Sequence, residues 1–593
     1  MKSTRIALLL TALMLLTSDP GRAALHYRSA GDHPWCGTHP TVLAESQARH
    51  RLFQRRAERD FQAASTLGDL PPALATPTAT KEGNVAVILD DADGSLISSS
   101  NLFDLGESGL AFRKKKKKIR AAASGAGISA EMGDRIETWE FCNDPDLCNG
   151  DDTSIEIDLA FKIRFYGTKY GKVYLNSDGN LTFLEADFES TPRDVSRTAN
   201  GPPRIAAFFN DLDPSQTSGN NGDFVNNAPT FLRVTWVNVP RFGLTDQNTF
   251  QVTLFKSGKI VMAYGTLSAT EAIIGTTPGR GAEFDFVDFT EELPFGPTKR
   301  GILERFTTSA EIDDLAVASA FFDAFQDIYS HLVIWVDFPI DLGGAFAFHL
   351  GLRNQVMGIG RGLFDFSDLA GSNGVLDSYL NMGSLANYPA DPDNEFLGTN
   401  STLEVLGQEA GHRWGSFVQF IDADGRRSND LLGRALAHWS FLLDSDASVL
   451  EGNDIRDNGD GTFTTVESTE RFSRLDQYLM GLRPKKQVPD FFYVIDTSGV
   501  AQPGDGPQEG VTVGGTRVDV SIDQVIAAEG ARVPKSADAP KVFKMAFILL
   551  AREGEPPTQE SIDKLQMIRQ RWQTFFKDGT DGKGKANTKL KLK

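Results

Sequence analysis

Cysteine is scarce in this chain, because only Cys36, Cys142 and Cys148 among its 593 residues carry a thiol. Three thiols allow one disulfide bond and leave one cysteine over. Cys142 and Cys148 flank a short segment with a proline turn, so we expect them to form a disulfide in an exported protein. Zinc binding at this pair is the alternative, but it needs more ligands than the segment supplies. Cys36 remains without an assigned partner.

Positive charge and long apolar runs are also in short supply. The chain has 60 Lys and Arg residues against 79 Asp and Glu residues, which gives a net charge of -19 and a pI near 5.0. This balance argues against nucleic acid as the main partner. After the first 23 residues no stretch approaches the length of a membrane span, so we expect none. The G-x-S-x-G and Walker A motifs are absent, which argues against a serine hydrolase and a P-loop enzyme.

The first 23 residues have the pattern of a secretory signal. Lys2 and Arg5 precede an apolar run, and the small residues Gly21 and Ala23 offer a cleavage site. The apolar run is too short to anchor the chain stably in a bilayer. The sequence therefore predicts a secreted or periplasmic protein.

Composition and periodicity divide the rest of the chain into several regions, as its length requires. Short alternating segments between Gly, Asn and Asp turns predict an antiparallel β-sandwich module. After this module, helix-like and strand-like segments alternate, which predicts an α+β domain. Within that domain a stripe of apolar residues predicts an amphipathic helix from about residue 559 to 576. We expect a signal at 1–23, an N-terminal arm or pro-segment with a linker at 24–80, a small β segment at 81–150, the β module at 151–300, the α+β domain at 301–577 and a basic disordered tail at 578–593.

The β module contains the phrases N-S-D-G-N-L-T-F, R-I-A-A-F-F-N-D-L-D-P and Q-V-T-L-F-K-S-G-K-I. In these phrases it resembles the nidogen-like extracellular module, and the resemblance implies contact with a surface or matrix. Asn210, Asp211 and Asp213 could bind calcium, because closely spaced carboxylate and amide oxygens suit a hard cation. The alternative is a polar loop that caps a strand.

The segment L-E-V-L-G-Q-E-A-G-H-R-W-G, residues 403–415, has helical spacing and carries Glu409 and His412. Zinc hydrolases use H-E-x-x-H on a helix because residues four apart share one face, so that two imidazoles hold a metal and the glutamate activates water. Here Gln408 stands in the place of the first histidine. Its amide oxygen suits hard cations better than zinc.

Three phrases occur in order: Q-E-A-G-H-R-W-G, A-H-W-S-F-L-L-D-S-D-A-S-V-L-E-G-N and L-D-Q-Y-L-M-G-L. With them the chain, from about residue 315 onward, resembles a family of secreted bacterial metallopeptidases of the zincin type. The resemblance implies a zinc-dependent site with Glu409 as general base and His412 as a metal ligand. His438 is the first candidate for a further ligand and Asp476 the second, and Met480 would give the apolar support of a Met-turn.

Because of Gln408, three outcomes stay open: weak zinc binding through His412, His438 and an acidic residue, another donor, or a fold without the metal. The leading hypothesis is a metallopeptidase that acts on an extracellular protein or peptide. The rival is a non-catalytic adhesion or binding protein that keeps a degenerate peptidase fold. Calcium is a secondary cofactor candidate at two acidic turns, 422–430 and 457–467, the second of which also has the pattern of a hairpin turn.

Overall fold

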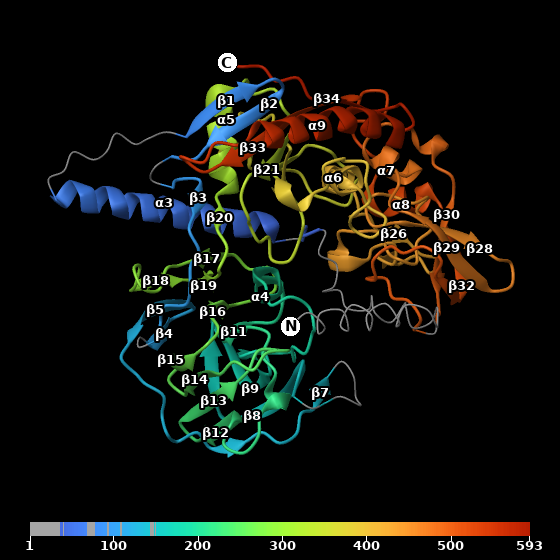
Figure 1. The fold of residues 1–593 in the computed structure, drawn as a ribbon. Helices are drawn as coiled ribbons and strands as arrows, with labels where there is room; N and C mark the ends of the chain where they lie inside the picture. Colours follow the sequence, from blue (N-terminus) through green and yellow to red (C-terminus); the bar gives the residue numbers. More distant parts are fainter. Residues whose placement is uncertain are drawn as a thin grey trace, which may run out of the picture.

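The computed structural model describes residues 36–39, 41–67, 77–91, 94–106, 109–142, 148, 150–497 and 499–593, so the expected signal at 1–23 lies outside the described residues. Figure 1 shows two modules, one above the other, with helix α3 (Val42–Leu67) between them. In the described part of the chain, no helix combines the length and the apolar character needed to cross a membrane.

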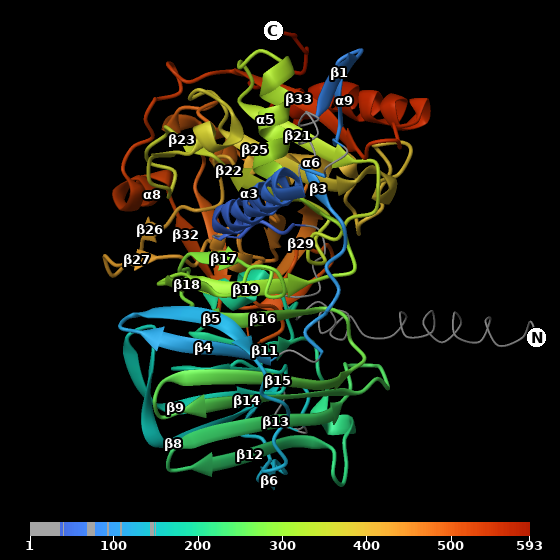
Figure 2. The same ribbon diagram turned by 90° about the vertical axis from the view of Figure 1, so that its left-hand side faces the viewer.

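The lower module is a sandwich of two eight-stranded sheets, whose strands are stacked in Figure 2. One sheet has the order β17-β19-β16-β11-β10-β9-β8-β7, with β17 at Phe284–Phe286, β19 at Gly301–Phe306, β16 at Ala272–Thr277, β11 at Arg204–Phe209, β10 at Asn180–Thr182, β9 at Thr168–Asn176, β8 at Thr153–Phe165 and β7 at Phe141–Cys142. The other has the order β18-β5-β4-β15-β14-β13-β12-β6, with β18 at Phe295–Thr298, β5 at Lys118–Ser124, β4 at Gly109–Lys115, β15 at Lys259–Leu267, β14 at Asn248–Phe255, β13 at Phe231–Val239, β12 at Gly222–Ala228 and β6 at Asp134–Arg135.

The core of the sandwich lies between its two sheets. Phe208 of one sheet packs against Phe250 of the other, with ring centroids 5.3 Å apart, and Trp236 stacks on Phe250. Alternate residues of β13 point into this core, which is the period that the sequence displays. The predicted antiparallel β-sandwich is confirmed.

The upper module is built on a mixed sheet of order β1-β2-β33-β21-β25-β22. The strands β2, β33, β21 and β25 are parallel neighbours, while β1 and β22 run antiparallel at the two ends. Their bounds are Thr78–Glu82 for β1, Val85–Leu89 for β2, Val542–Ala551 for β33, His331–Val336 for β21, Ser378–Ser384 for β25 and Phe348–Gly351 for β22.

Helices cover both faces of this mixed sheet. Along β21, Leu332 and Ile334 share a core with α5 (Asp314–Ala324). Val333 and Trp335 face the other way, into the core formed with α6 (Thr402–Gly411) and α9 (Gln559–Gly579). A strand buried on both faces needs apolar residues at every position, and H-L-V-I-W-V comes close to that pattern.

Short elements before and after α6 complete the upper module. They are α7 (Arg474–Leu479), α8 (Ile522–Glu529), the sheet β28-β29-β31 (Asn453–Asp457, Thr462–Ser468 and Thr512–Gly514), and the strand pairs β30-β32 (Phe491–Ile495 and Thr516–Val520), β26-β27 (Phe420–Ile421 and Arg427–Ser428) and β23-β24 (Arg353–Asn354 and Phe364–Asp365). The pair β3-β20 (Ile97–Ser98 and Glu311–Ile312) lies between the modules in sequence, and α4 (Val195–Asn200) belongs to the sandwich.

Two expected boundaries need correction. The segment 81–150 is not one unit, because β1 and β2 join the upper sheet while β4 and β5 join the sandwich. The apolar run of β2 is almost fully buried and pairs with β33, far along the chain. The tail 578–593 is ordered rather than disordered, because β34 (Lys585–Asn587) pairs with β33 and Leu590 is buried in the upper core.

Helix α3 is held by both modules rather than loosely attached. Its apolar residues Ala48 and Leu52 pack with Phe284 and Phe286 of the sandwich. Its basic residues pair with acidic residues of both modules: Arg51 with Asp285, Arg55 with Glu292, Arg56 with Asp288, Arg49 with Glu311 and Asp314, and His50 with Asp313. This helix therefore connects the modules by apolar contacts and by ion pairs.

Candidate metal centre

Helix α6 carries Glu409 and His412 into the interior of the upper module. Ser401 starts the helix with a capping box in which Glu404 returns to the Ser401 backbone. The helix ends at Gly411, and His412 is its C-terminal cap. Residues three apart lie on one side of a helix, so Glu409 and His412 are directed to the same region. Both side chains have no exposed area.

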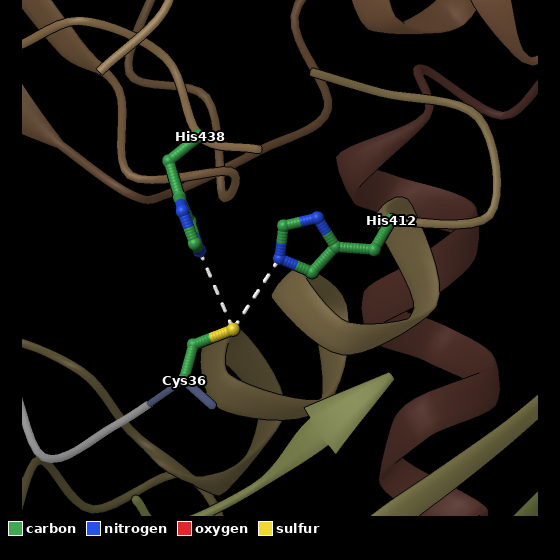
Figure 3. A group of neighbouring side chains, drawn as sticks. All are labelled: Cys36, His412 and His438. Atoms are coloured by element: carbon green, nitrogen blue, oxygen red, sulfur yellow. Dashed lines mark hydrogen bonds between the residues drawn. The ribbon is translucent and has the colours of Figure 1, made fainter. Parts of the chain in front are cut away.

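His438 and Cys36 complete a group of three metal-ligating side chains, drawn in Figure 3. The Cys36 Sγ atom lies 3.4 Å from His412 Nε2 and 3.3 Å from His438 Nε2. The three residues come from the N-terminal segment (residues 36–39), the end of α6 and a loop beyond it, and all are buried. We call this group the Cys-His-His cluster.

Neighbouring groups orient His438 within the cluster. Its Nδ1 atom lies 2.9 Å from the carbonyl oxygen of Arg434, a contact that favours the tautomer with a proton on Nδ1 and a lone pair on Nε2. The Arg434 guanidinium pairs with Glu451, and its Nη1 donates to the Cys36 carbonyl oxygen at 3.0 Å. The Glu451 carboxylate in turn lies 3.5 Å from His438 Nε2.

Glu409 lies beside the cluster and contacts the same N-terminal segment. Its Oε2 accepts a hydrogen bond of 3.1 Å from the Thr38 hydroxyl, whereas Oε1 is buried without a hydrogen-bond partner. Burial raises the pKa of Glu409 to about 8. Burial also lowers the pKa of His412 well below its ordinary value and raises the pKa of Cys36. A bound cation would favour the thiolate and the neutral imidazoles.

The donor atoms of the cluster fit zinc in chemistry and in distance, provided that Arg434 Nη2, which lies 3.1 Å from His438 Nε2, withdraws from that nitrogen. Thiolate sulfur and imidazole nitrogen are the donors that zinc prefers. With Zn–S near 2.3 Å and Zn–N near 2.0–2.1 Å, tetrahedral ligands place sulfur and nitrogen about 3.5 Å apart. The observed separations of 3.4 and 3.3 Å are close to this value.

The other predicted site residues lie outside this cluster. Gln408 directs its amide to Glu451, with Nε2 donating to Oε1 at 3.0 Å. Asp476 accepts hydrogen bonds from the Ser448 hydroxyl, the Ser473 backbone and the Trp439 indole, and it forms the capping box of α7. These three bonds use its carboxylate for local structure. Met480, the C-terminal cap of α7, is buried in the main core of the upper module.

The candidate calcium residues are mostly engaged in local bonds. Asp213 accepts from the Ser215 backbone at 3.0 Å, and the Asn210 amide donates to the Glu271 carbonyl. Asp211 lies with Asp151 and Asp152 in an acidic group and pairs with Arg193.

Elsewhere, the acidic segment 457–467 consists of the end of β28, a turn at 458–461 and most of β29, which form a hairpin. The disulfide between Cys142 and Cys148 is present.

A cavity of about 1010 Å³ lies between the two modules, next to the N-terminal segment. Cys36 and Thr38 line it, together with Arg193 of the sandwich and Arg434. Glu409, in contrast, has no exposed area. Within the cluster, Cys36 lines this cavity, whereas His412 and His438 do not.

Sequence reasoning missed Cys36, Arg434 and Glu451. Cys36 stands 376 residues before His412, and no local pattern links the two. The signal in the sequence was that Cys36 is left over once Cys142 and Cys148 form a disulfide, so it is free to bind a metal. Glu451 lies inside the phrase D-S-D-A-S-V-L-E-G-N that carried the family resemblance, so that phrase contained a further residue of the site.

Comparison with known proteins gives one match. A family model described as "NIDO related" matches residues 137–293, within the sandwich. No curated protein and no solved structure matches the chain. The β-sandwich is therefore a nidogen-like module, and the match does not extend to the module that holds the Cys-His-His cluster.

Proposed function

We propose that the upper module is a zinc-dependent peptidase of the zincin type. The observation that carries this proposal is the convergence of His412 and His438 beside Glu409, a buried carboxylate with one oxygen unpartnered. The resemblance of the three ordered phrases to secreted metallopeptidases also supports it. A buried carboxylate oxygen without a hydrogen bond is costly, which favours a functional role for Glu409 Oε1.

In this proposal the residues divide the work as follows. His412 and His438 would hold zinc through their Nε2 atoms, and Arg434 orients His438 through its carbonyl oxygen. Bound zinc supplies Lewis acidity, which polarises a carbonyl group and makes water easier to deprotonate. Glu409 accepts the proton of the attacking water at Oε1 and delivers it to the amine that leaves.

The cavity between the two modules offers a place for the substrate. The cavity between the modules is large enough for several residues of a peptide, and its lining carries both acidic and basic side chains. We propose a secreted or periplasmic enzyme whose nidogen-like module contacts a surface or matrix and brings extracellular protein to this cavity.

One observation favours a different function. Gln408 replaces the histidine of H-E-x-x-H, and its amide is used to bind Glu451. A chain that had lost catalysis could keep this arrangement for stability. The alternative is therefore a non-catalytic extracellular binding protein in which the nidogen-like module makes the contacts.

Metal analysis of the purified full chain tests the proposal, together with His412→Ala and His438→Ala. The control is His50→Gln, a half-buried histidine of α3 that pairs with Asp313 and is not part of the cluster. We expect near-stoichiometric zinc in the unchanged chain and in the control, and strong loss in both alanine variants. A chain without zinc even after reconstitution would overturn the metallopeptidase.

Glu409→Gln separates the peptidase from the binding protein. This variant should retain zinc but lose chelator-sensitive cleavage of fluorescently labelled casein, because an amide cannot accept the proton. Equal cleavage by the variant and by the unchanged chain would remove Glu409 from the mechanism.

A further inference from the structure

We infer that Arg361 binds a carboxylate of the substrate, so that the proposed peptidase acts on peptides that carry a carboxylate close to the cleaved bond. This inference rests on the proposed function and names the class of substrate for the same site. The carboxylate is either the C-terminus of the peptide or the side chain of an acidic residue, two sources that share one chemistry.

The first support is that the Arg361 guanidinium has no carboxylate of its own. Within the part of the chain that the structure describes, its side chain makes no hydrogen bond and no ion pair. Two aromatic rings hold it instead: its Cζ atom lies 4.7 Å from the ring centre of Phe417 and 5.1 Å from that of Phe364. Contact with a ring uses the plane of a guanidinium and leaves the N–H groups along its edge for a ligand.

The second support is a surplus of positive charge around Arg361. Burial and the neighbouring charge of Arg413 lower the pKa of Arg361 to about 10, which still leaves it charged at neutral pH. Asp377 does not offset this charge, because it is shared between Arg413 at 3.3 Å and Arg353 at 3.6 Å. A partly buried cation without a counter-charge is costly. In a chain with a net charge of -19, this surplus favours a role in binding an anion.

The third support is the position of the guanidinium against the edge strand β22. Gly351 is the last residue of this strand, and a Cβ atom there would lie 3.2 Å from both Nη atoms of Arg361 and 3.3 Å from His349 Cε1. These distances are shorter than ordinary van der Waals contacts. The missing side chain of Gly351 therefore lets the guanidinium lie against the end of β22.

The fourth support is the short distance from Arg361 to the Cys-His-His cluster. Phe417, which contacts Arg361, has its ring centre 6.5 Å from that of His412. His349, which lies on the other side of the guanidinium, has its ring centre 6.1 Å from that of His412. An extended chain spans at most about 3.3–3.6 Å per residue, so roughly two or three residues of a peptide connect the metal position with Arg361.

This subsite is separate from the cavity between the modules. Phe348 of β22 lines that cavity, whereas Arg361 does not. Successive residues of a strand point to opposite faces, so His349 and Gly351 lie on the face of β22 opposite to Phe348. A substrate that crosses the edge of β22 therefore contacts the cavity on one side and Arg361 on the other.

Fluorescence anisotropy of dansyl-labelled tripeptides tests the subsite without catalysis. Every protein is the full chain with Glu409→Gln, so that no probe is cleaved. The probes are dansyl-Ala-Ala-Phe with a free C-terminus, the same peptide as its amide, and the amide of dansyl-Ala-Glu-Phe. We expect binding of a probe that carries a carboxylate, and Arg361→Gln should weaken this binding at least about tenfold, because a charge-assisted pair is lost.

Arg552→Gln is the matched control. Arg552 also lies over an aromatic ring, with its Cζ atom 4.7 Å from the ring centre, but it follows the end of β33. Trp414, just after α6, packs on Phe543 at the opposite end of that strand. The control should bind every probe as the unchanged side chain does. Arg361→Lys keeps the charge without the planar fork, so it should restore only part of the binding.

Chemical labelling supplies a measurement that does not depend on the folding of a variant. Phenylglyoxal modifies accessible arginine side chains, and mass spectrometry locates the modified residues in the unchanged chain. A probe that carries a carboxylate should protect Arg361 and leave Arg552 reactive. Equal modification of Arg361 with and without this probe would overturn the carboxylate subsite.

The three probes also distinguish the sources of the carboxylate. Binding of the free C-terminus alone, dependent on Arg361, would identify the substrates as chain ends. Binding of the glutamate-containing amide, equally dependent on Arg361, would identify them as acidic segments within longer chains. Equal affinities of Arg361→Gln and Arg552→Gln, or no binding of any probe, would overturn the inference.

Zinc content and casein cleavage separate this inference from the proposed function. If the chain holds no zinc and leaves casein intact while the probes still need Arg361, the carboxylate subsite stands as part of a binding protein and the peptidase falls. If casein is cleaved in a way that needs Glu409 while probe binding ignores Arg361→Gln, the peptidase stands and the carboxylate subsite falls.

Discussion

Replacement of Asp187 by Asn should destabilise the nidogen-like module strongly. The Asp187 carboxylate pairs with Arg204 and with Arg197, whose Nη2 lies 2.8 Å from Oδ1. The Arg204 side chain has no exposed area and stacks on the ring of Phe209. Removal of one partner from a buried ion pair leaves an uncompensated charge, which typically costs about 3–5 kcal/mol. In a module of this size that corresponds to a decrease in Tm of roughly 6–20 °C.

Differential scanning calorimetry of the full chain measures this loss. The control is Glu283→Gln, because Glu283 pairs with Arg300 where both side chains are well exposed. Exposed pairs contribute about 0–1 kcal/mol, so the control should shift the transition little. Equal shifts in the two variants would refute the argument that burial makes the Asp187 pair valuable.

The same pair predicts a pH dependence. Burial alone would raise the pKa of Asp187, but the charges of Arg204 and Arg197 hold this pKa below its ordinary value. A lowered folded-state pKa adds stability at neutral pH and loses it as the pH falls below about 4. The difference in Tm between Asp187→Asn and the unchanged chain should therefore shrink in acid.

Three further predictions concern the upper module. Asp476→Asn should lower the Tm measured by calorimetry and leave the zinc content unchanged, because Asp476 accepts hydrogen bonds from Ser448, Ser473 and Trp439 and is not part of the cluster. Loss of zinc from a variant with an intact fold would show that Asp476 is a ligand. Leu590→Ala should lower the free energy of unfolding, measured with denaturant, by about 2–5 kcal/mol, because the Leu590 side chain is buried in the core with 1% exposed. An unchanged unfolding transition would mean that Leu590 does not anchor the tail. Thr38→Val removes the hydrogen bond from Thr38 to Glu409, so the Cys36 thiol should react faster with a disulfide reagent, as measured by absorbance. An unchanged rate would argue that Thr38 does not anchor the segment that carries Cys36.

Local patterns in the sequence predicted individual helices and strands better than they predicted which elements pack or pair with each other. The stripe that predicted a helix at 559–576 corresponds to α9, where Leu565, Ile568 and Trp572 are buried. The alternation along β13 likewise predicted a half-buried strand. Both patterns arise from the period of one element, which a sequence displays directly.

Contacts between distant segments could not be predicted in this way. Nothing near Val85 indicates that β2 pairs with β33, because a buried strand reads the same beside any neighbour. The basic composition after residue 578 predicts disorder, whereas Ala586 and Leu590 are buried in the upper module and anchor the end of the chain. Cys36 lies beside His412 because its backbone pairs with Ala347, a contact between distant segments that no local pattern predicts.

X-ray absorption at the zinc edge of the purified full chain tests the central claim most directly. We expect nitrogen ligands at about 2.0–2.1 Å and one sulfur ligand at about 2.3 Å, because His412, His438 and Cys36 would surround a bound zinc ion. In Cys36→Ser the sulfur contribution should vanish while the nitrogen contribution remains. Absence of zinc, or a zinc shell without sulfur in the unchanged chain, would contradict the metal centre described above.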